Sequence, residues 1–127
     1  MHRQHTPSTV AAPFSRYSHG IETQNAQNWL LISGQVGVDP DGELAEGATA
    51  QMEQIWRNIF AVLAAAKMNA HHIVKVTAFL TRREDLADFR EVRDRMMRDA
   101  KPASTLVFVS GLAHPDWLVE IEAIAAK

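Results

Sequence analysis

Two carboxylates lie two residues apart in a strongly apolar segment near the end of the chain. Glu120 and Glu122 belong to residues 118–125, which otherwise contain only Leu, Val, Ile and Ala and predict a β-strand. Successive strand side chains point to opposite faces, so both carboxylates share one face and the apolar side chains share the other. A buried carboxylate without a partner is costly or takes up a proton. We therefore expect this face to meet something polar, either a reacting ligand or, as the alternative, backbone amides or an arginine of a neighbouring subunit.

A second apolar segment, residues 102–109, reads Pro-Ala-Ser-Thr-Leu-Val-Phe-Val and predicts another strand. Its Pro-Ala start and the Val-Glu-Ile-Glu-Ala-Ile-Ala of residues 119–125 together resemble the signature of the YjgF/RidA family of small imine and enamine deaminases. The resemblance extends from about residue 12 to the end of the chain. Other matching motifs occur in the family's order: Tyr17-Ser18-His19-Gly20, Ile32-Ser33-Gly34-Gln35, Asn58-Ile59 and Ile73-Val74-Lys75-Val76.

The resemblance implies roles for several residues. Glu120 matches the glutamate that positions the water attacking the imine carbon. Ser33 and Gly34 match a turn whose backbone contacts bound ligands, although Gly34 is alternatively a plain turn glycine. Tyr17 and Leu106 fall at positions that line the ligand pocket, and subunit packing is the alternative for both.

Ser104 stands where imine-deaminating relatives carry an arginine after Pro-Ala. In the family this arginine binds the substrate carboxylate through two parallel hydrogen bonds, and a serine hydroxyl offers neither the charge nor the second donor. Losing such a pair costs about 2–5 kcal/mol of binding. Simple 2-imino acids should therefore be poor substrates. A serine nucleophile would require a basic neighbour and an oxyanion hole, and the spacing predicts neither.

Two further residues are candidates for the pocket. His19 stands where the family usually has glutamine, and close to Glu120 it would supply acid–base chemistry; a surface hydrogen bond is the alternative. Arg93 falls near a family asparagine that borders the pocket, and it would restore a cation there. The alternative for Arg93 is a solvent-facing helix arginine paired with Asp94 or Asp99.

Composition limits the other functions. The 127 residues predict a single RidA-like domain, residues 1–127, with residues 1–12 as a loose arm or edge strand. A net charge of −2 provides no basic field for nucleic acid. The absence of cysteine excludes disulfides and fits the cytoplasm. No apolar run approaches the ~20 residues that cross a bilayer. The histidines lack the spacing of metal ligands, and we expect no metal and no cofactor.

The element pattern predicts an α+β fold in the order β-β-α-β-α-β-β. Residues 18–22 and 29–35 predict a hairpin, residues 45–66 a helix with a left-handed cap at Asn69, and residues 73–80 a strand. Thr81 and Glu84 predict a capping box that opens a second helix, ending near residue 98. The last two strands are those already described.

Two helices cover only one face of a mixed sheet, and the other face is predicted to be largely apolar, so copies of the chain should bury it. The resemblance likewise implies a homotrimer of chorismate-mutase-like fold with small-molecule clefts between subunits. The sequence thus predicts hydrolytic deamination of an imine or enamine other than a simple 2-imino acid. The alternative is a trimer that binds small carbonyl or imine metabolites without catalysis. A chorismate-mutase-like rearrangement is weakly supported, because the matched pocket lacks the several cations it would need.

Overall fold

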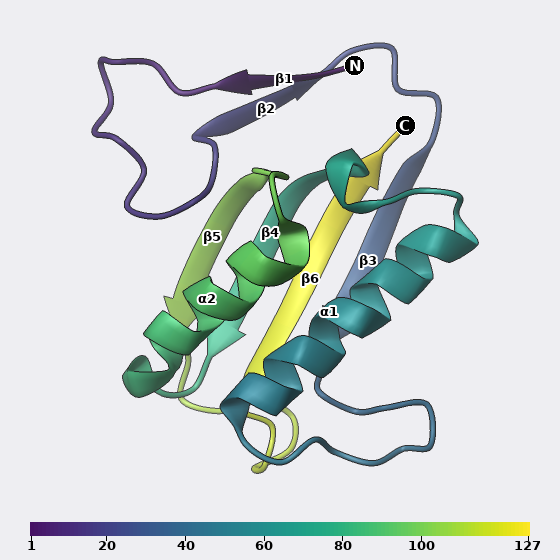
Figure 1. Ribbon diagram of the computed structural model, residues 1–127, viewed down its shortest axis with the longest axis vertical. Coiled ribbons are helices and arrows are strands. Elements are labelled where there is room, and N and C mark those ends of the chain that lie inside the picture. The colour runs from purple at the N-terminus through teal and green to yellow at the C-terminus, as the bar shows by residue number, and fades with distance from the viewer.

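A four-stranded mixed sheet forms the centre of the protein, and the computed structural model describes all of residues 1–127 (Figure 1). The strands lie in the order β3 (Trp29–Gln35), β6 (Val119–Ala126), β4 (Ile73–Leu80) and β5 (Ala103–Phe108). β4 pairs in parallel with β5 and antiparallel with β6, and β6 pairs antiparallel with β3. This arrangement confirms the predicted α+β fold with a mixed sheet.

Helices α1 (Ala48–Ala65) and α2 (Leu86–Met97) cover the same face of this sheet (Figure 1). The side chains of α1 that pack on the sheet recur at three- and four-residue spacing, which keeps them on one side of a helix. They are Met52, Ile55, Ile59 and Leu63, all fully buried. Phe89 and Val92 do the same for α2. The core therefore lies between the two helices and one face of the sheet. No helix of the protein combines the length and apolarity needed to cross a bilayer.

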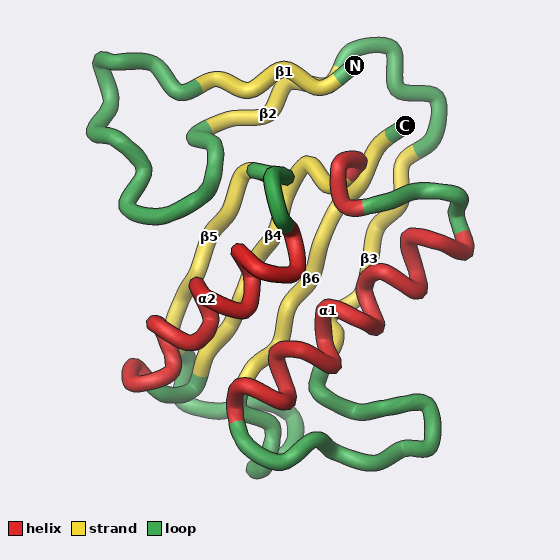
Figure 2. Tube along the Cα trace, in the orientation of Figure 1, coloured by secondary structure: helices red, strands yellow, loops and turns green.

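A separate two-stranded sheet lies beside the N-terminus (Figure 2), where β1 (His2–His5) pairs antiparallel with β2 (Gly20–Thr23). The predicted hairpin between residues 18–22 and 29–35 is therefore wrong. Asn28, in the intervening turn, exchanges two backbone hydrogen bonds with Lys127, so the chain turns towards the C-terminus and β3 pairs with β6. The turn residues are polar enough for a hairpin, but they do not specify which strand becomes the partner.

Two predicted helix caps are also wrong. Lys67, with φ 57°, takes the left-handed conformation after α1, whereas Asn69 is extended and accepts a hydrogen bond from the amide of His71 at the start of a 3₁₀ turn, η1 (Ala70–His72). Thr81 forms no capping box, because its hydroxyl donates to the carbonyl of Leu118 at 3.1 Å. A second 3₁₀ turn, η2 (Arg83–Asp85), leads into α2 instead.

The face of the sheet without helices, called here the helix-free face, mixes apolar and polar side chains. Trp29, Leu31 and Val107 are exposed apolar residues. Lys75 and Thr77 make β4 more polar on this face than predicted, and the Lys75 ammonium donates to the Thr105 hydroxyl at 2.7 Å. The prediction of a largely apolar second face is therefore correct for parts of the sheet and wrong for the middle of β4.

Candidate functional site

Glu120 lies on the helix-free face, near the start of β6. It pairs with Phe79 of β4, and Glu122 pairs with Thr77, so alternation places both carboxylates on the side opposite the core. Glu120 is half-buried, whereas Glu122 is exposed. The two carboxylates therefore share a face as predicted, and only Glu120 is partly enclosed.

Gly34 explains how the Glu120 side chain is enclosed. The β3–β6 register shifts between Ile32 and Gln35, and Gly34 lies in this irregularity. A Cβ atom at Gly34 would lie closest to Oε1 of Glu120 and only 2.8 Å from its Cδ. Only glycine therefore allows the carboxylate to rest against the β3 backbone. The structure brings Gly34 together with Glu120, and Ser33 is the exposed residue before it.

Four of the remaining candidates, all except His19, line a cavity of about 210 Å³ between α2, β5 and the segment before β2, called here the α2–β5 cavity. Ser104 and Leu106 pair with Val76 and Ala78, whose side chains belong to the core, so both face α2. The structure thus assembles four of the predicted residues in one cavity. Its complete lining is Phe14, Ser15, Tyr17, Leu86, Phe89, Arg90, Arg93, Ser104 and Leu106.

Hydrogen bonds fix the segment that carries Tyr17 against this cavity. Ser18 is buried, and its hydroxyl donates to the carbonyl of Lys101 at 2.6 Å while its amide donates to that of Pro102 at 3.2 Å. Arg16 donates to the carbonyl of Arg98, just after α2, at 2.8 Å. These contacts tie residues 16–18 to the short connection between α2 and β5, the two elements on either side of the cavity.

Arg93 belongs to the cavity wall and is not the solvent-facing arginine of the alternative prediction. Its side chain is only 7% exposed, and its guanidinium carbon lies 5.7 Å from the centre of the Phe89 ring. The predicted pairing with Asp94 does occur, with Nε donating to Oδ1 at 3.1 Å. The signal for burial was present in the sequence, because Arg93 follows Phe89 by four residues and therefore shares its helix face.

His19 lies away from Glu120. Its Nε2 donates to the carbonyl of Ala11 at 2.6 Å, and its ring meets Tyr17 edge-on at 5.9 Å. Ser18, next to His19, forms a β-bridge with Ala103, at the end of the sheet where β5 begins. Ala103 pairs with Lys75 of β4, whereas Glu120 pairs with Phe79, four residues further along the same strand. This separation is ~13 Å at the usual strand rise. Within one chain the structure does not place this histidine beside the carboxylate.

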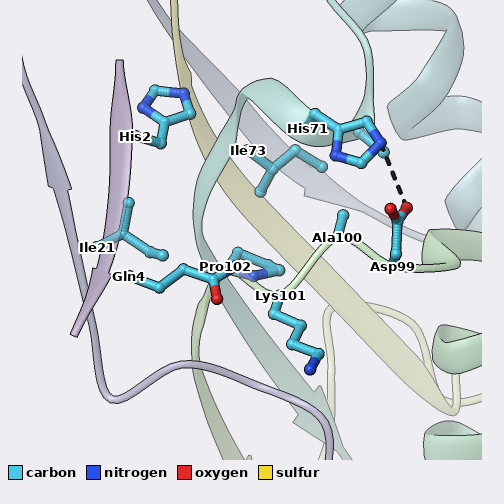
Figure 3. A pocket seen from close by; sticks show the side chains of 10 residues that line it. His2, Gln4, Ile21, His71, Ile73, Asp99, Ala100, Lys101 and Pro102 are labelled. Atoms are coloured by element: carbon cyan, nitrogen blue, oxygen red, sulfur yellow. Dashed lines mark ion pairs between the residues drawn. The ribbon is translucent and has the colours of Figure 1, made fainter. Parts of the chain in front are cut away.

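Another cavity, of about 220 Å³, lies between the β1–β2 sheet and the connection after α2 (Figure 3). Its side chains include His2, Gln4 and Lys101, and His71 Nε2 lies 3.4 Å from Asp99 Oδ1. Both partners of that pair are largely exposed. None of the residues predicted from the sequence to form the site lies in this cavity.

The shifted pKa values belong to other parts of the surface. Hydrogen bonds from Gln24 and His5 lower the pKa of Glu22 on β2. Partial burial, and then the charge of Lys127, lower the pKa of His72. A hydrogen bond to Asp85 raises the pKa of Arg82, and one to Glu91 raises that of Arg95. Three of these shifts arise from local pairing, and that of His72 arises from burial and a nearby positive charge.

Known protein sequences include relatives that match nearly the whole of this chain. The family model described as endoribonuclease L-PSP matches residues 8–127. A RutC family protein of Pyrococcus horikoshii is 40% identical over 117 residues, which cover 91% of this chain and 90% of that protein. The mouse 2-iminobutanoate/2-iminopropanoate deaminase is 32% identical over 124 residues, covering 94% and 89%.

Solved structures show the same fold. The Rid-family protein YyfB of Yersinia pestis, of unknown function, superposes with a TM-score of 0.88 at 28% identity and covers 99% of this chain and 98% of its own. RidA of an Antarctic Psychrobacter superposes with a TM-score of 0.75 at 33% identity, covering 98% and 99%. The chain therefore belongs to the YjgF/RidA family, whose sequence model has the description endoribonuclease L-PSP.

Proposed function

We propose that this protein hydrolyses small reactive imines or enamines, with Glu120 positioning the attacking water. The observation that carries the proposal is the half-buried Glu120 carboxylate resting on Gly34. The mouse relative, named as a 2-imino acid deaminase, supports the reaction class.

The reaction needs only water and a carboxylate. The water oxygen bonds to the imine carbon as Glu120 takes one water proton, and the carboxyl group returns this proton to the nitrogen, which gives a neutral carbinolamine. Glu120 then takes the hydroxyl proton and gives it to the nitrogen as the C–N bond breaks, so that a carbonyl compound and ammonia leave. Atoms and electrons balance without a cofactor, and the role of Gly34 is to hold the carboxylate in one position.

We further propose that the complete site forms between copies of the chain. Glu120 lies on the helix-free face, whereas Ser104 and Leu106 face α2, so one chain alone does not bring the water and the cavity together. The exposed apolar side chains Trp29, Leu31 and Val107 support self-association through the helix-free face. In the proposed homotrimer, the Glu120 of one copy faces the α2–β5 cavity of the next.

Ser104 shapes the proposed substrate range. Because β5 contributes a hydroxyl in place of a cation, we expect small imines and enamines other than simple 2-imino acids to be the better substrates. The same serine favours the second candidate function, a trimer that binds such carbonyl or imine metabolites without turnover.

Neither proposal includes nucleic acid or a membrane surface, and both place the protein in the cytoplasm. Cleavage of RNA, which the family description endoribonuclease names, would require a basic surface to bind the phosphates. The net charge of this chain is −2. Arg57, Arg82 and Arg95 also pair with carboxylates at 3.5 Å or less.

An ammonia-release assay tests the proposal. The protein is given 2-imino acids generated in situ by an amino acid oxidase and, separately, imines and enamines without a carboxylate on the reacting carbon. We expect faster release from the second group and a fall of about 100-fold or more in Glu120→Gln, the typical contribution of a positioned general base. Glu122→Gln is the matched control, since its carboxylate lies on the same face of β6 but is exposed.

The outcomes separate the two candidates. Full activity in Glu120→Gln contradicts the mechanism. Saturable binding of the carbonyl products without ammonia release from any substrate contradicts the enzyme and supports the binding protein.

A further inference from the structure

We infer that Arg93 of α2 supplies the cation of the α2–β5 cavity, and that the site takes ligands bearing a carboxylate. The inference deepens the proposed function and rests on it for the nature of the reacting group. Arg93 on α2 would then provide the positive charge that β5, with Ser104, lacks.

The charge of the cavity lining is one-sided. Arg90 and Arg93 both line it, and none of its nine lining residues is acidic. The other polar lining groups are the hydroxyls of Ser15, Tyr17 and Ser104, which donate hydrogen bonds to anions readily. A small cavity lined by two cations and three hydroxyls is suited to an anion.

The guanidinium of Arg93 has donors to spare. Its side chain is 93% removed from solvent, yet its one hydrogen bond runs from Nε to Oδ1 of Asp94. Nη2 is buried and, apart from its 3.0 Å ion-pair contact with the same oxygen, has no hydrogen-bond partner. Asp94, one-third exposed, therefore occupies one edge of the guanidinium and leaves other N–H groups for a ligand.

The position of the cation is fixed by a rigid element. Arg93 projects from the middle of α2, and its contact with Phe89 restrains the guanidinium. Ser104, on the opposite wall, is too short to fill the space between β5 and α2, and the cavity occupies that space. A carboxylate bound there lies towards α2.

This position defines the substrate class. Arg93 on α2 would hold a ligand's carboxylate at a different place from a cation on β5. The reacting carbon of the ligand therefore need not be the carbon that carries the carboxylate. The structure thus favours imines and enamines of oxo acids in which the carboxylate and the C=N carbon are separated.

Calorimetry with a carbonyl product and its neutral isostere tests the inference. The probes are 4-oxopentanoate and 4-oxopentanamide, titrated into the assembled full-length protein carrying Glu120→Gln, so that binding is read without turnover. We expect the acid to bind about tenfold or more tightly than the amide, as a charge-assisted pair implies, and the ratio to approach one in Arg93→Met. Arg95→Met is the matched control on the same helix, because Arg95 pairs with Glu91 and Glu53 outside the cavity and should keep the preference.

Equal affinities for acid and amide, or a preference that survives Arg93→Met, would overturn the inference. Should Arg93→Met not fold, Ser104→Asp gives the same test from the opposite wall, because a second anion beside Arg93 must abolish the preference for the acid. An Arg93-dependent preference without ammonia release from any substrate would instead contradict the proposed enzyme and leave the anion site standing.

Discussion

Gly34 allows the carboxylate of Glu120 to lie against the backbone of β3. The side chain is held by close contact rather than by an ion pair, since no salt bridge of Glu120 occurs in the structure. The carboxylate therefore keeps its oxygens available to water. At the scale of single residues, the proposed chemistry depends on this one contact.

Gly34→Ala should reduce ammonia release strongly with little loss of stability. The added methyl group would lie 2.8 Å from Cδ of Glu120, and the flexible side chain can swing away where a backbone could not. We expect a fall in activity of about tenfold or more as the water loses its position, measured beside the melting temperature. Gly111→Ala is the control, because no atom lies within 4 Å of a Cβ placed there. Unchanged activity in a folded Gly34→Ala protein would contradict the role of the contact.

At the scale of elements, residues 16–18, called here the strap, lie before β2 and border the α2–β5 cavity. Ser18 anchors it before β5, and Arg16 anchors it after α2. The strap is positioned by backbone carbonyls of distant residues. Hydrophobic periodicity carries no information about such contacts, so the sequence pattern did not predict the strap.

Removing the strap's anchor should loosen the cavity. Ser18→Ala leaves the carbonyl of Lys101 without its buried 2.6 Å donor, which costs about 1–3 kcal/mol of unfolding free energy. Chemical denaturation measures this loss. Binding of 4-oxopentanoate should also weaken, because Tyr17 belongs to the strap and should move with it. Ser110→Ala, at an exposed position, should change neither quantity. Wild-type affinity in Ser18→Ala would show that the strap does not shape the cavity.

At the scale of the whole molecule, the two groups of candidate residues are complementary halves. The carboxylate lies on the helix-free face, and the cavity opens between α2 and β5. In the proposed homotrimer a second copy joins them, and the exposed Leu31, at 74% exposure, and its apolar neighbours would accommodate that copy. Assembly and activity should therefore be lost together.

Leu31→Asp tests this coupling. An aspartate buried between copies without a partner costs several kcal/mol, so the assembly should dissociate. Sedimentation velocity should show the monomer, and ammonia release should fall in parallel. Ala61→Asp, on the exposed side of α1, adds the same charge away from the sheet and should leave the assembly intact. A monomeric Leu31→Asp protein with full activity would refute a site shared between copies.

Local patterns were sufficient for the elements themselves. Period-two alternation predicted strand 73–80 and the shared face of Glu120 and Glu122, and three- and four-residue spacing predicted α1, because both signals are repeated along a single element. The separated motifs also identified the family, since their order is carried by the chain alone.

Only the tertiary structure decided which elements meet. It replaced the predicted hairpin with the β1–β2 pair, showed that Arg93 lies in a cavity wall, and separated Glu120 from Ser104 onto opposite faces of one sheet. The physical reason is that strand pairing and the burial of a polar side chain depend on partners far away in the sequence, whose register and side-chain contacts no local pattern contains.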